Sequence, residues 1–270
     1  MSENSAISWT NSSWNPVTGC TKISAGCAHC YAERFAERWR GIPGHAYEQG
    51  FDLKLWPERL QLPLRWRAPR MVFVNSMSDL FHEKVPEEYI RQIFAVMKQA
   101  ERHTFQVLTK RSARLQELAD SLEWPANVWL GVTIESEDYV ERANDLRRVP
   151  AAVRFISAEP LLGPLDSLEL AGINWLIVGG ESGPGRRRMQ PEWAMHLRDK
   201  CCEEQVAFYF KQWGGVRPDP EPPLLDGEIC REMPSGVTSG TGGASLEGTC
   251  RVSDRAPGRS LSDALPLPLA

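Results

Sequence analysis

The stretch Met71-Val72-Phe73-Val74-Asn75-Ser76-Met77-Ser78-Asp79 passes without a break from four apolar residues to mostly polar ones. Five further runs rich in β-branched and aromatic residues follow, at 105–108, 128–134, 153–156, 173–178 and 206–210. Charged stretches with helical spacing lie between them, at 86–100, 112–122, 136–149 and 191–205. Strands that alternate with helices predict repeated βα units around a parallel sheet. We therefore expect an α/β fold, a partial TIM-type β/α barrel.

Polar residues follow nearly every expected strand. In a parallel barrel the carboxyl ends of the strands form the mouth of the active site, so these residues are expected to meet there. Any strand must end in polar turn residues, so one such end alone carries little weight, but Thr-Lys-Arg, Ala-Glu-Pro and Lys-Gln-Trp are not ordinary turn formers. The candidates that this pattern selects are Asn75, Ser76, Asp79, Thr109, Lys110, Glu159, Gly179, Gly180, Lys211 and Trp213.

Composition places limits on the class of protein. The chain has 31 basic and 35 acidic residues, a net charge of -4, which argues against a generally basic nucleic-acid coat. No apolar run approaches the roughly 20 residues of a membrane-spanning helix, and Met1–Ser5 lacks the features of a secretory signal. We expect a cytoplasmic protein that does not bind membranes.

The aromatic residues indicate the domain boundary. All 24 Trp, Tyr and Phe residues lie at or before Trp213, and residues 216–270 contain none. Such a segment cannot bury enough apolar surface to offset the entropy of ordering it. We predict one domain over 1–233, with 224–227 still docked on it, and a disordered tail over 234–270.

Cysteines crowd near the N-terminus. Seven cysteines in a chain without an export signal favour metal or redox chemistry over a disulfide framework. Cys20, Cys27 and Cys30 precede a predicted helix whose aromatic stripe recurs every fourth residue and is expected to be buried. Three kinds of site are compatible with these cysteines. Structural zinc normally needs four ligands, and His29 or His45 could be the fourth. A redox CxxC would not need Cys20, and a [4Fe-4S] cluster held by three cysteines leaves one iron open.

A loop of three cysteines that ends in CxxC and an aromatic residue resembles that of the radical SAM superfamily. Its spacing here is CX6CX2C, whereas CX3CX2C is the commonest in the superfamily. The sequence as a whole, over residues from about 7 to 233, is similar to a phage-associated radical-SAM-like family of unknown function. The stretches that carry this second resemblance are 14–16, 30–34, 75–81, 108–111, 179–183 and 211–215.

The resemblance implies a β/α barrel of the radical SAM kind and a cofactor set. Cys20, Cys27 and Cys30 would each bind one iron of a [4Fe-4S] cluster, and S-adenosylmethionine would chelate the fourth. A low-potential donor of flavodoxin or ferredoxin type would supply the electron that cleaves S-adenosylmethionine to a 5′-deoxyadenosyl radical. The residues expected to contact S-adenosylmethionine are Tyr31, Asn75, Ser76, Thr109, Lys110, Gly179 and Gly180. Two alternatives stay open: Lys110 could pair with Glu135, and Glu159 could only orient Lys110 or Arg111.

The substrate side of the expected site is formed by Glu159, Lys211, Trp213 and Asp79, although Trp213 alone is more typical of a core aromatic. A long connection over 41–70 mixes four arginines with Trp56 and Trp66, and 186–188 is a run of three arginines. This composition favours a nucleic-acid or nucleotide substrate, unless the arginines pair with surface carboxylates. The alternative functions are a non-catalytic zinc-binding barrel that recognises nucleic acid and a barrel in which the cluster is a structural relic.

Overall fold

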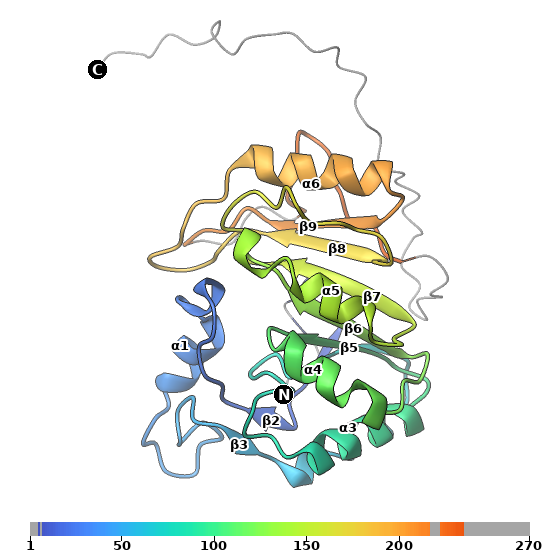
Figure 1. The fold of residues 1–270 in the computed structure, drawn as a ribbon. Helices are drawn as coiled ribbons and strands as arrows, with labels where there is room; N and C mark the ends of the chain where they lie inside the picture. The colour runs from blue at the N-terminus through green and yellow to red at the C-terminus, as the bar shows by residue number, and fades with distance from the viewer. Residues whose placement is uncertain (1–4, 6, 217–221, 235–270) are drawn as a thin grey trace, which may run out of the picture.

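Seven parallel strands form one sheet, in the order β1-β4-β5-β6-β7-β8-β9 (Figure 1). A computed structural model of the chain describes residue 5 and residues 7–216 and 222–234. All six predicted strands are confirmed, most of them to within a residue or two at each end. The strands are β1 Ser12–Trp14, β4 Met71–Val74, β5 Thr104–Thr109, β6 Val128–Thr133, β7 Val153–Ala158, β8 Trp175–Gly179 and β9 Ala207–Gln212.

The prediction lacked three short strands. β1 has only three residues, all buried, and pairs in parallel with β4 from Ser12 opposite Val72 to Trp14 opposite Val74. β2 Val17–Thr18 and β3 Lys54–Leu55 form a separate antiparallel pair. Segments of two or three residues are too short for the alternation that reveals a strand in sequence.

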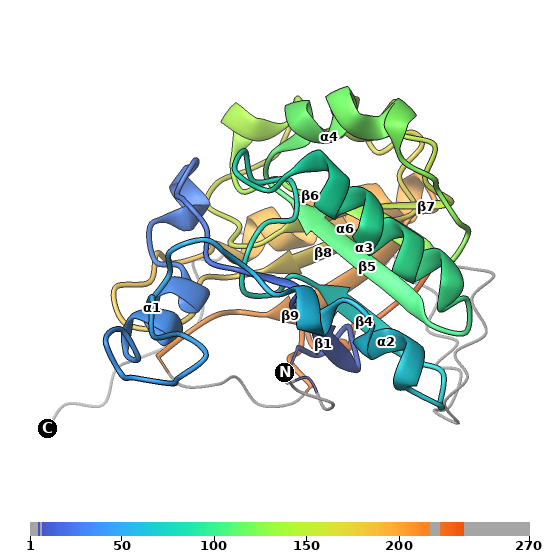
Figure 2. The same cartoon turned by 90° about the horizontal axis from the view of Figure 1, so that it is seen from below.

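The sheet is curled into half a barrel (Figure 2). Its concave side is filled with aromatic rings, and Trp9, just before β1, reaches Phe73 of β4 at 4.8 Å and Trp175 of β8 at 6.2 Å between ring centroids. Side chains near opposite ends of the strand order meet in this way only because the sheet bends around them. β1 and β9 remain the two edges, so the partial barrel that the sequence predicted is confirmed.

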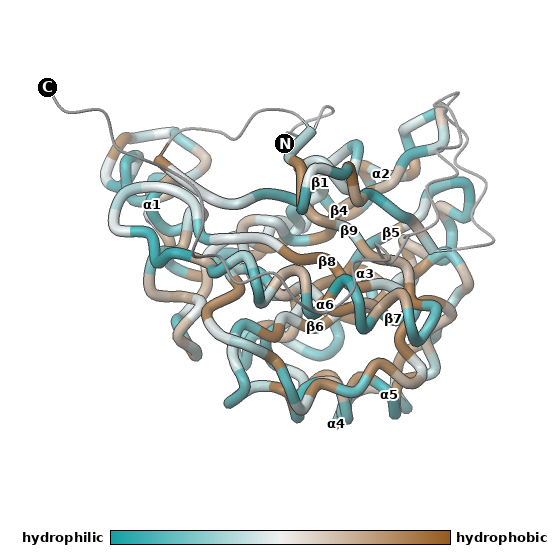
Figure 3. Tube along the Cα trace, turned by 90° about the horizontal axis from the view of Figure 1, so that it is seen from above, coloured by the Kyte–Doolittle hydropathy of each residue, from teal (hydrophilic) through white to brown (hydrophobic). Residues whose placement is uncertain are grey.

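Four helices cover the convex side of the sheet (Figures 1 and 2). Each lies within a stretch that was predicted to be helical, and α3 buries the predicted face of Tyr89, Ile90, Ile93, Phe94 and Met97. The main hydrophobic core lies between these helices and the strands, whose apolar residues run through the centre of the molecule in Figure 3. The helices are α3 Glu87–Gln99, α4 Ser112–Leu118, α5 Arg142–Arg147 and α6 Pro191–Glu203.

The helix after the cysteines, α1 Tyr31–Glu37, differs from the prediction. Its aromatic stripe was expected to be buried, but Tyr31 is 53% exposed and Phe35 is 43% exposed. The buried side chains are Ala32 and Ala36. Because alanine carries only a methyl group, the helix can lie close against the rest of the protein on that side, and this leaves the large rings on the outside.

The remaining elements are short. α2 Leu62–Arg65 follows the 3-10 turn Pro57–Arg59, and further 3-10 turns lie at Ala25–Cys27, Ala119–Ser121 and Glu137–Tyr139. No helix in the described ranges combines the length and the apolar character that crossing a membrane requires.

The last described residues pack on the sheet. Leu225 is fully buried, which confirms that 224–227 is docked, and Tyr209 of β9 forms an antiparallel bridge with Arg231. Apart from Pro234, the predicted disordered tail over 234–270 lies outside the described residues.

Candidate functional site

A cavity of about 260 Å³ lies at the carboxyl ends of the strands. One wall is the segment 20–30, here called the cysteine loop, and the other walls are residues that follow β4, β5, β7, β8 and β9. The structure brings together every predicted site residue except Gly179 and Trp213. Those that line the cavity are Cys20, Cys27, Cys30, Tyr31, Asn75, Ser76, Asp79, Thr109, Lys110, Glu159, Gly180 and Lys211.

Trp213, Gly179 and Gly180 pack against other parts of the protein. Trp213 packs on Phe210, with 4.8 Å between ring centroids, and its Nε1 donates a hydrogen bond to the Leu224 carbonyl. It is therefore the core aromatic that the sequence left open as an alternative, not a wall of the cavity. A Cβ on Gly180 would lie 1.9 Å from the Trp213 carbonyl oxygen, and one on Gly179 would lie 2.7 Å from Glu159 Oε1. The backbone at Trp213 therefore requires glycine at position 180, whereas a side chain at position 179 would displace the Glu159 carboxylate.

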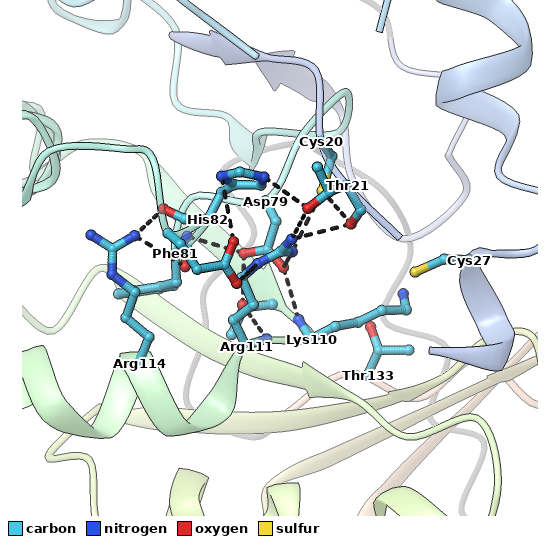
Figure 4. A network of polar contacts seen from close by, with 12 residues as sticks. Cys20, Thr21, Cys27, Asp79, Phe81, His82, Lys110, Arg111, Arg114 and Thr133 are labelled. Atoms are coloured by element: carbon cyan, nitrogen blue, oxygen red, sulfur yellow. Dashed lines mark hydrogen bonds and ion pairs between the residues drawn. The ribbon is translucent and has the colours of Figure 1, made fainter. Parts of the chain in front are cut away.

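Arg111 and Asp79 form a buried ion pair behind Cys20 (Figure 4). Arg111 Nη1 lies 3.2 Å from Asp79 Oδ2 and donates a second hydrogen bond to Cys20 Sγ at 3.5 Å. Its Nη2 donates to the carbonyl and the hydroxyl oxygens of Thr21, at 3.1 and 3.0 Å. Arg111 thus fixes the start of the cysteine loop.

Asp79 was predicted to face the substrate, and its contacts give it a different duty. In addition to Arg111, its carboxylate accepts hydrogen bonds from the Thr109 hydroxyl at 2.7 Å and from the amides of Phe81 and Lys110, each at 3.0 Å. These four donors surround a carboxylate that has little exposure, so its position is fixed by the protein's own hydrogen bonds. Asp79 therefore positions Arg111 and the end of β5.

Glu135 fixes the middle of the cysteine loop. Its side chain is fully buried; one oxygen lies 2.8 Å from Arg142 Nη1, and the other accepts a hydrogen bond from the Gly26 amide at 3.2 Å. Gly26 has no side chain to displace this carboxylate, since a Cβ there would lie 2.9 Å from Glu135 Oε1. Glu135 pairs with Arg142, so the alternative in which it pairs with Lys110 is wrong.

Glu181 fixes the end of the cysteine loop. It accepts a hydrogen bond at 3.0 Å from His29, inside the CxxC, and forms a bidentate pair with Arg187. Burial opposes ionisation of this carboxyl, but the hydrogen bonds from Arg187 and His29 outweigh burial and lower its pKa to about 2. Glu181 therefore stays charged and holds His29 through its Nδ1 atom.

These three anchors were missed as functional residues by sequence reasoning. Each follows a strand whose polar end had been noticed, which was the available signal, but nothing in the sequence tells that its partner is the cysteine loop. Arg111 follows β5, Glu135 follows β6 and Glu181 follows β8, so three strands of one sheet hold one short loop.

The surroundings of Cys20 and Cys27 shift the pKa values of the two thiols in opposite directions. Burial and the nearby charge of Asp79 together raise the pKa of the Cys20 thiol to about 11, because Arg111 offsets them only in part. Burial also acts on Cys27, but the charge of Lys110 and hydrogen bonds from the loop outweigh it and lower its pKa. Cys27 is therefore the thiol that ionises more readily.

Two polar groups in the cavity wall lack partners. The Lys110 side chain extends toward Cys27 and has no hydrogen bond or ion pair for its ammonium group within the described part of the chain (Figure 4). Asn75 adopts a left-handed backbone with φ of 59° and accepts a hydrogen bond from the Val17 amide, while its buried Nδ2 has no partner. The buried Nδ2 of Asn75 lacks the partner that such a group usually has, and Lys110 is only partly buried, so both are available to donate to a group in the cavity.

Glu159 and Lys211 face each other at the end of the cavity formed by β7 and β9. Their charged atoms lie 2.7 Å apart, and the Ser157 hydroxyl donates to the other Glu159 oxygen at 3.1 Å. Both side chains are partly exposed, at 13% and 23%. Glu159 therefore orients Lys211, not Lys110 or Arg111, and the pair remains accessible from the cavity.

The cysteine loop does not form a complete site for a metal ion in this structure. Within the described ranges no three His, Cys, Asp or Glu side chains form a group that could hold one. Cys20, Cys27 and Cys30 are free thiols on one cavity wall. His29 is engaged with Glu181, and His45 stacks on Trp39 at 4.2 Å, so neither completes a zinc site.

The basic stretch over 41–70 does not reach the cavity, except for Phe51. The charged groups of Lys54 and Arg59 lie over the Trp56 ring, 3.9 and 3.6 Å from its centroid. The guanidinium of Arg70 lies 5.1 Å from the centroid of the Trp66 ring. These rings therefore contact the protein's own cations, and are not free platforms for bases.

Comparison with known proteins gives a family but no reaction. No curated protein and no solved structure matches the chain. One family model, described as a protein of unknown function (DUF5131), matches residues 4–265. Because the match spans nearly all of the 270 residues, the chain belongs to the DUF5131 family.

Proposed function

We propose that this protein is a radical SAM-type enzyme that holds a [4Fe-4S] cluster through Cys20, Cys27 and Cys30. The observation that carries the proposal is the cavity at the carboxyl ends of the strands, one wall of which bears three free cysteines fixed by three buried charged residues. A loop with no bound group would not need such anchoring, because each buried charge costs free energy that its partners must offset.

The cavity offers suitable groups for S-adenosylmethionine beside the cysteines. Lys110 and the unpaired Nδ2 of Asn75 are donors for its carboxylate or ribose oxygens. Tyr31 is held by a hydrogen bond from its hydroxyl to the Ser76 carbonyl at 2.5 Å, so its ring stands at the edge of the cavity. Together with a reduced cluster, S-adenosylmethionine supplies hydrogen-atom abstraction.

The substrate side of the proposed site is the Glu159–Lys211 pair. It lies on β7 and β9, away from the anchors of the cysteine loop, and its two charges can bind a polar group or exchange a proton with it. A flavodoxin- or ferredoxin-type protein would supply the electron. The substrate is a nucleic acid or nucleotide in this proposal.

The test is anaerobic purification, iron and sulfide analysis, then reduction with dithionite in the presence of S-adenosylmethionine. We expect a brown protein with about four irons per chain that releases 5′-deoxyadenosine. The Cys27→Ala variant, prepared in the same way, should contain almost no iron and should release no 5′-deoxyadenosine. A colourless wild-type protein with one tightly bound zinc would contradict the proposal and favour the zinc-binding barrel. Iron without 5′-deoxyadenosine would favour a relic cluster.

A further inference from the structure

The outward side of α1 combines aromatic rings with arginines. Tyr31, Arg34, Phe35 and Arg38 are spaced i, i+3, i+4 and i+7, so they share one face of the helix, which we call the α1 face. Its two rings are about half exposed, whereas the alanines of the helix are buried. An ordinary surface helix shows the opposite arrangement, with its large apolar residues turned to the core.

The rings of the α1 face are rigidly supported. Phe35 packs edge-on against Tyr47 at 5.5 Å and lies 6.4 Å from Trp39, which in turn stacks on His45. The Tyr31 hydroxyl is tied to the Ser76 carbonyl. Exposed rings that are fixed in place lose little conformational entropy when a flat group stacks on them, so they suit recognition of bases.

A second arginine-rich segment lies beside this face. Arg34 donates to the Ser182 carbonyl at 3.1 Å, and a Cβ on Gly185 would lie 3.6 Å from His29, so the turn over 182–188 packs against α1 and the cysteine loop. In Figure 1 this turn and α1 lie at the same end of the sheet. Arg187 points inward to Glu181, and its neighbours Arg186 and Arg188 are exposed.

The charge of this region is positive after internal pairing. Glu33 is paired with Lys22, and Glu37 with Arg40. Within the described residues Arg38, Arg186 and Arg188 have no carboxylate partner, and Arg34 contacts only a carbonyl. Near them, Glu48 accepts a hydrogen bond from the Gly44 amide and forms no ion pair in the described ranges. Arg34, Arg38, Arg186 and Arg188 therefore have no carboxylate partner within the described residues, on a chain whose net charge is negative.

We propose that the α1 face and the turn over 182–188 bind single-stranded nucleic acid, with Tyr31 and Phe35 stacking on bases and Arg38, Arg186 and Arg188 binding phosphates. Single-stranded binding sites combine these two elements, stacking rings and a cationic path for the backbone. Tyr31 belongs to both the α1 face and the cavity, so a strand bound here passes the mouth of the candidate site. The arginines of this surface belong to α1 and to the turn over 182–188, not to the basic connection over 41–70.

Binding of a fluorescent oligo(dT) to the full-length protein, followed by anisotropy over a range of salt concentrations, tests this proposal. The triple variant R38A/R186A/R188A should bind at least tenfold more weakly, and the slope of log K against log salt should fall by about 2. The matched control is R65A/R67A, two exposed arginines of the basic connection, which should bind like the wild type. No binding by the wild type, or a loss only in the control, would overturn the proposal.

Stacking is tested separately with Phe35→Ala, which leaves the core intact because the ring is exposed. We expect it to weaken binding of oligo(dT) about tenfold and to leave binding of an abasic oligonucleotide unchanged. Equal competition by duplex DNA or by poly-aspartate would show that the face binds polyanions or an acidic protein without reading bases, and would overturn it. These measurements can be made with and without bound iron, so they stand apart from the test of the radical SAM proposal.

Discussion

Two groups of cysteines in this protein experience opposite surroundings. Cys20, Cys27 and Cys30 lie on a loop at the end of the sheet and line a cavity, and charged side chains contact the start, the middle and the end of that loop. Cys201 and Cys202 lie in α6, Cys230 lies beside the edge strand β9, and Cys201 and Cys230 are buried in the main core. The second group behaves as small apolar residues do, whereas the first is built into a polar site.

The difference shows that position in the fold decides what a thiol does. Cys201 and Cys230 belong to the hydrophobic core, and burial, the largest cause, raises the pKa of Cys230 to about 11 although Arg198 opposes it. Cys27 is partly buried too, yet Lys110 and loop hydrogen bonds lower its pKa.

The largest expected effect is on bound iron. Cys27→Ala should reduce the iron content from about four per chain to almost none, because one ligand of a three-cysteine set is lost. Cys202→Ala should leave it unchanged, since this residue lies in α6. Iron analysis of the two anaerobically purified variants decides the point, and equal loss in both would show that the ligand set is wrong.

Arg111 should matter for stability as well as for iron. Arg111→Met leaves Asp79 buried without its cation and should lower the free energy of unfolding by about 3–5 kcal/mol. The double variant R111M/D79N removes the unpaired charge and should regain part of that loss, measured by urea denaturation.

Iron content separates the two duties of Arg111. In the double variant it should stay low, because Cys20 and Thr21 have lost their donor. Arg114→Met, which removes contacts to three backbone carbonyls and none to a cysteine, is the matched control and should keep its iron. Full iron in R111M/D79N would mean that Arg111 has only a structural role.

Glu181 should make stability depend on pH in the acid range. Its folded pKa of about 2 lies below the ordinary value of 4.5, so its contribution is complete above about pH 4.5 and is lost as the pH falls toward 2. A shift of this size corresponds to about 3 kcal/mol. Glu181→Gln should therefore be less stable than the wild type at pH 7, and the difference should shrink toward pH 2. Equal stability of the two proteins at pH 7 in thermal or urea unfolding would contradict this assignment.

The smallest effect concerns thiol reactivity in the metal-free protein. At pH 8 iodoacetamide should modify Cys27 about tenfold faster than Cys20, because more of Cys27 is thiolate. Lys110→Met should slow the modification of Cys27 by a few-fold and leave the rate at Cys202 unchanged. Both rates are followed by peptide mass spectrometry. Faster modification of Cys20 than of Cys27 would contradict the assigned surroundings.

Much of the architecture could be predicted from the sequence because it depends on local pattern. The six longer strands have enough β-branched and aromatic residues to stand out, and parallel topology then brings their polar ends together without further information. This is why most of the predicted site residues line one cavity.

The remainder depended on contacts between distant residues. The spacing of Tyr31 and Phe35 identifies one face of a helix, but whether that face is buried depends on what lies opposite, and here Ala32 and Ala36 pack inward. Likewise, the sequence marks Glu135 as polar, but only the fold shows that its partners are Arg142 and the Gly26 amide.

The anchoring of the cysteine loop has a consequence for biosynthesis. Glu181, which holds His29, comes 152 residues later in the chain, and at roughly 5–20 residues per second the ribosome needs about 8–30 s to reach it. Until then the cysteine loop lacks the contact that holds its last residues in the folded protein. The complete framework of the three thiols therefore forms only after nearly all of the sheet has been synthesised.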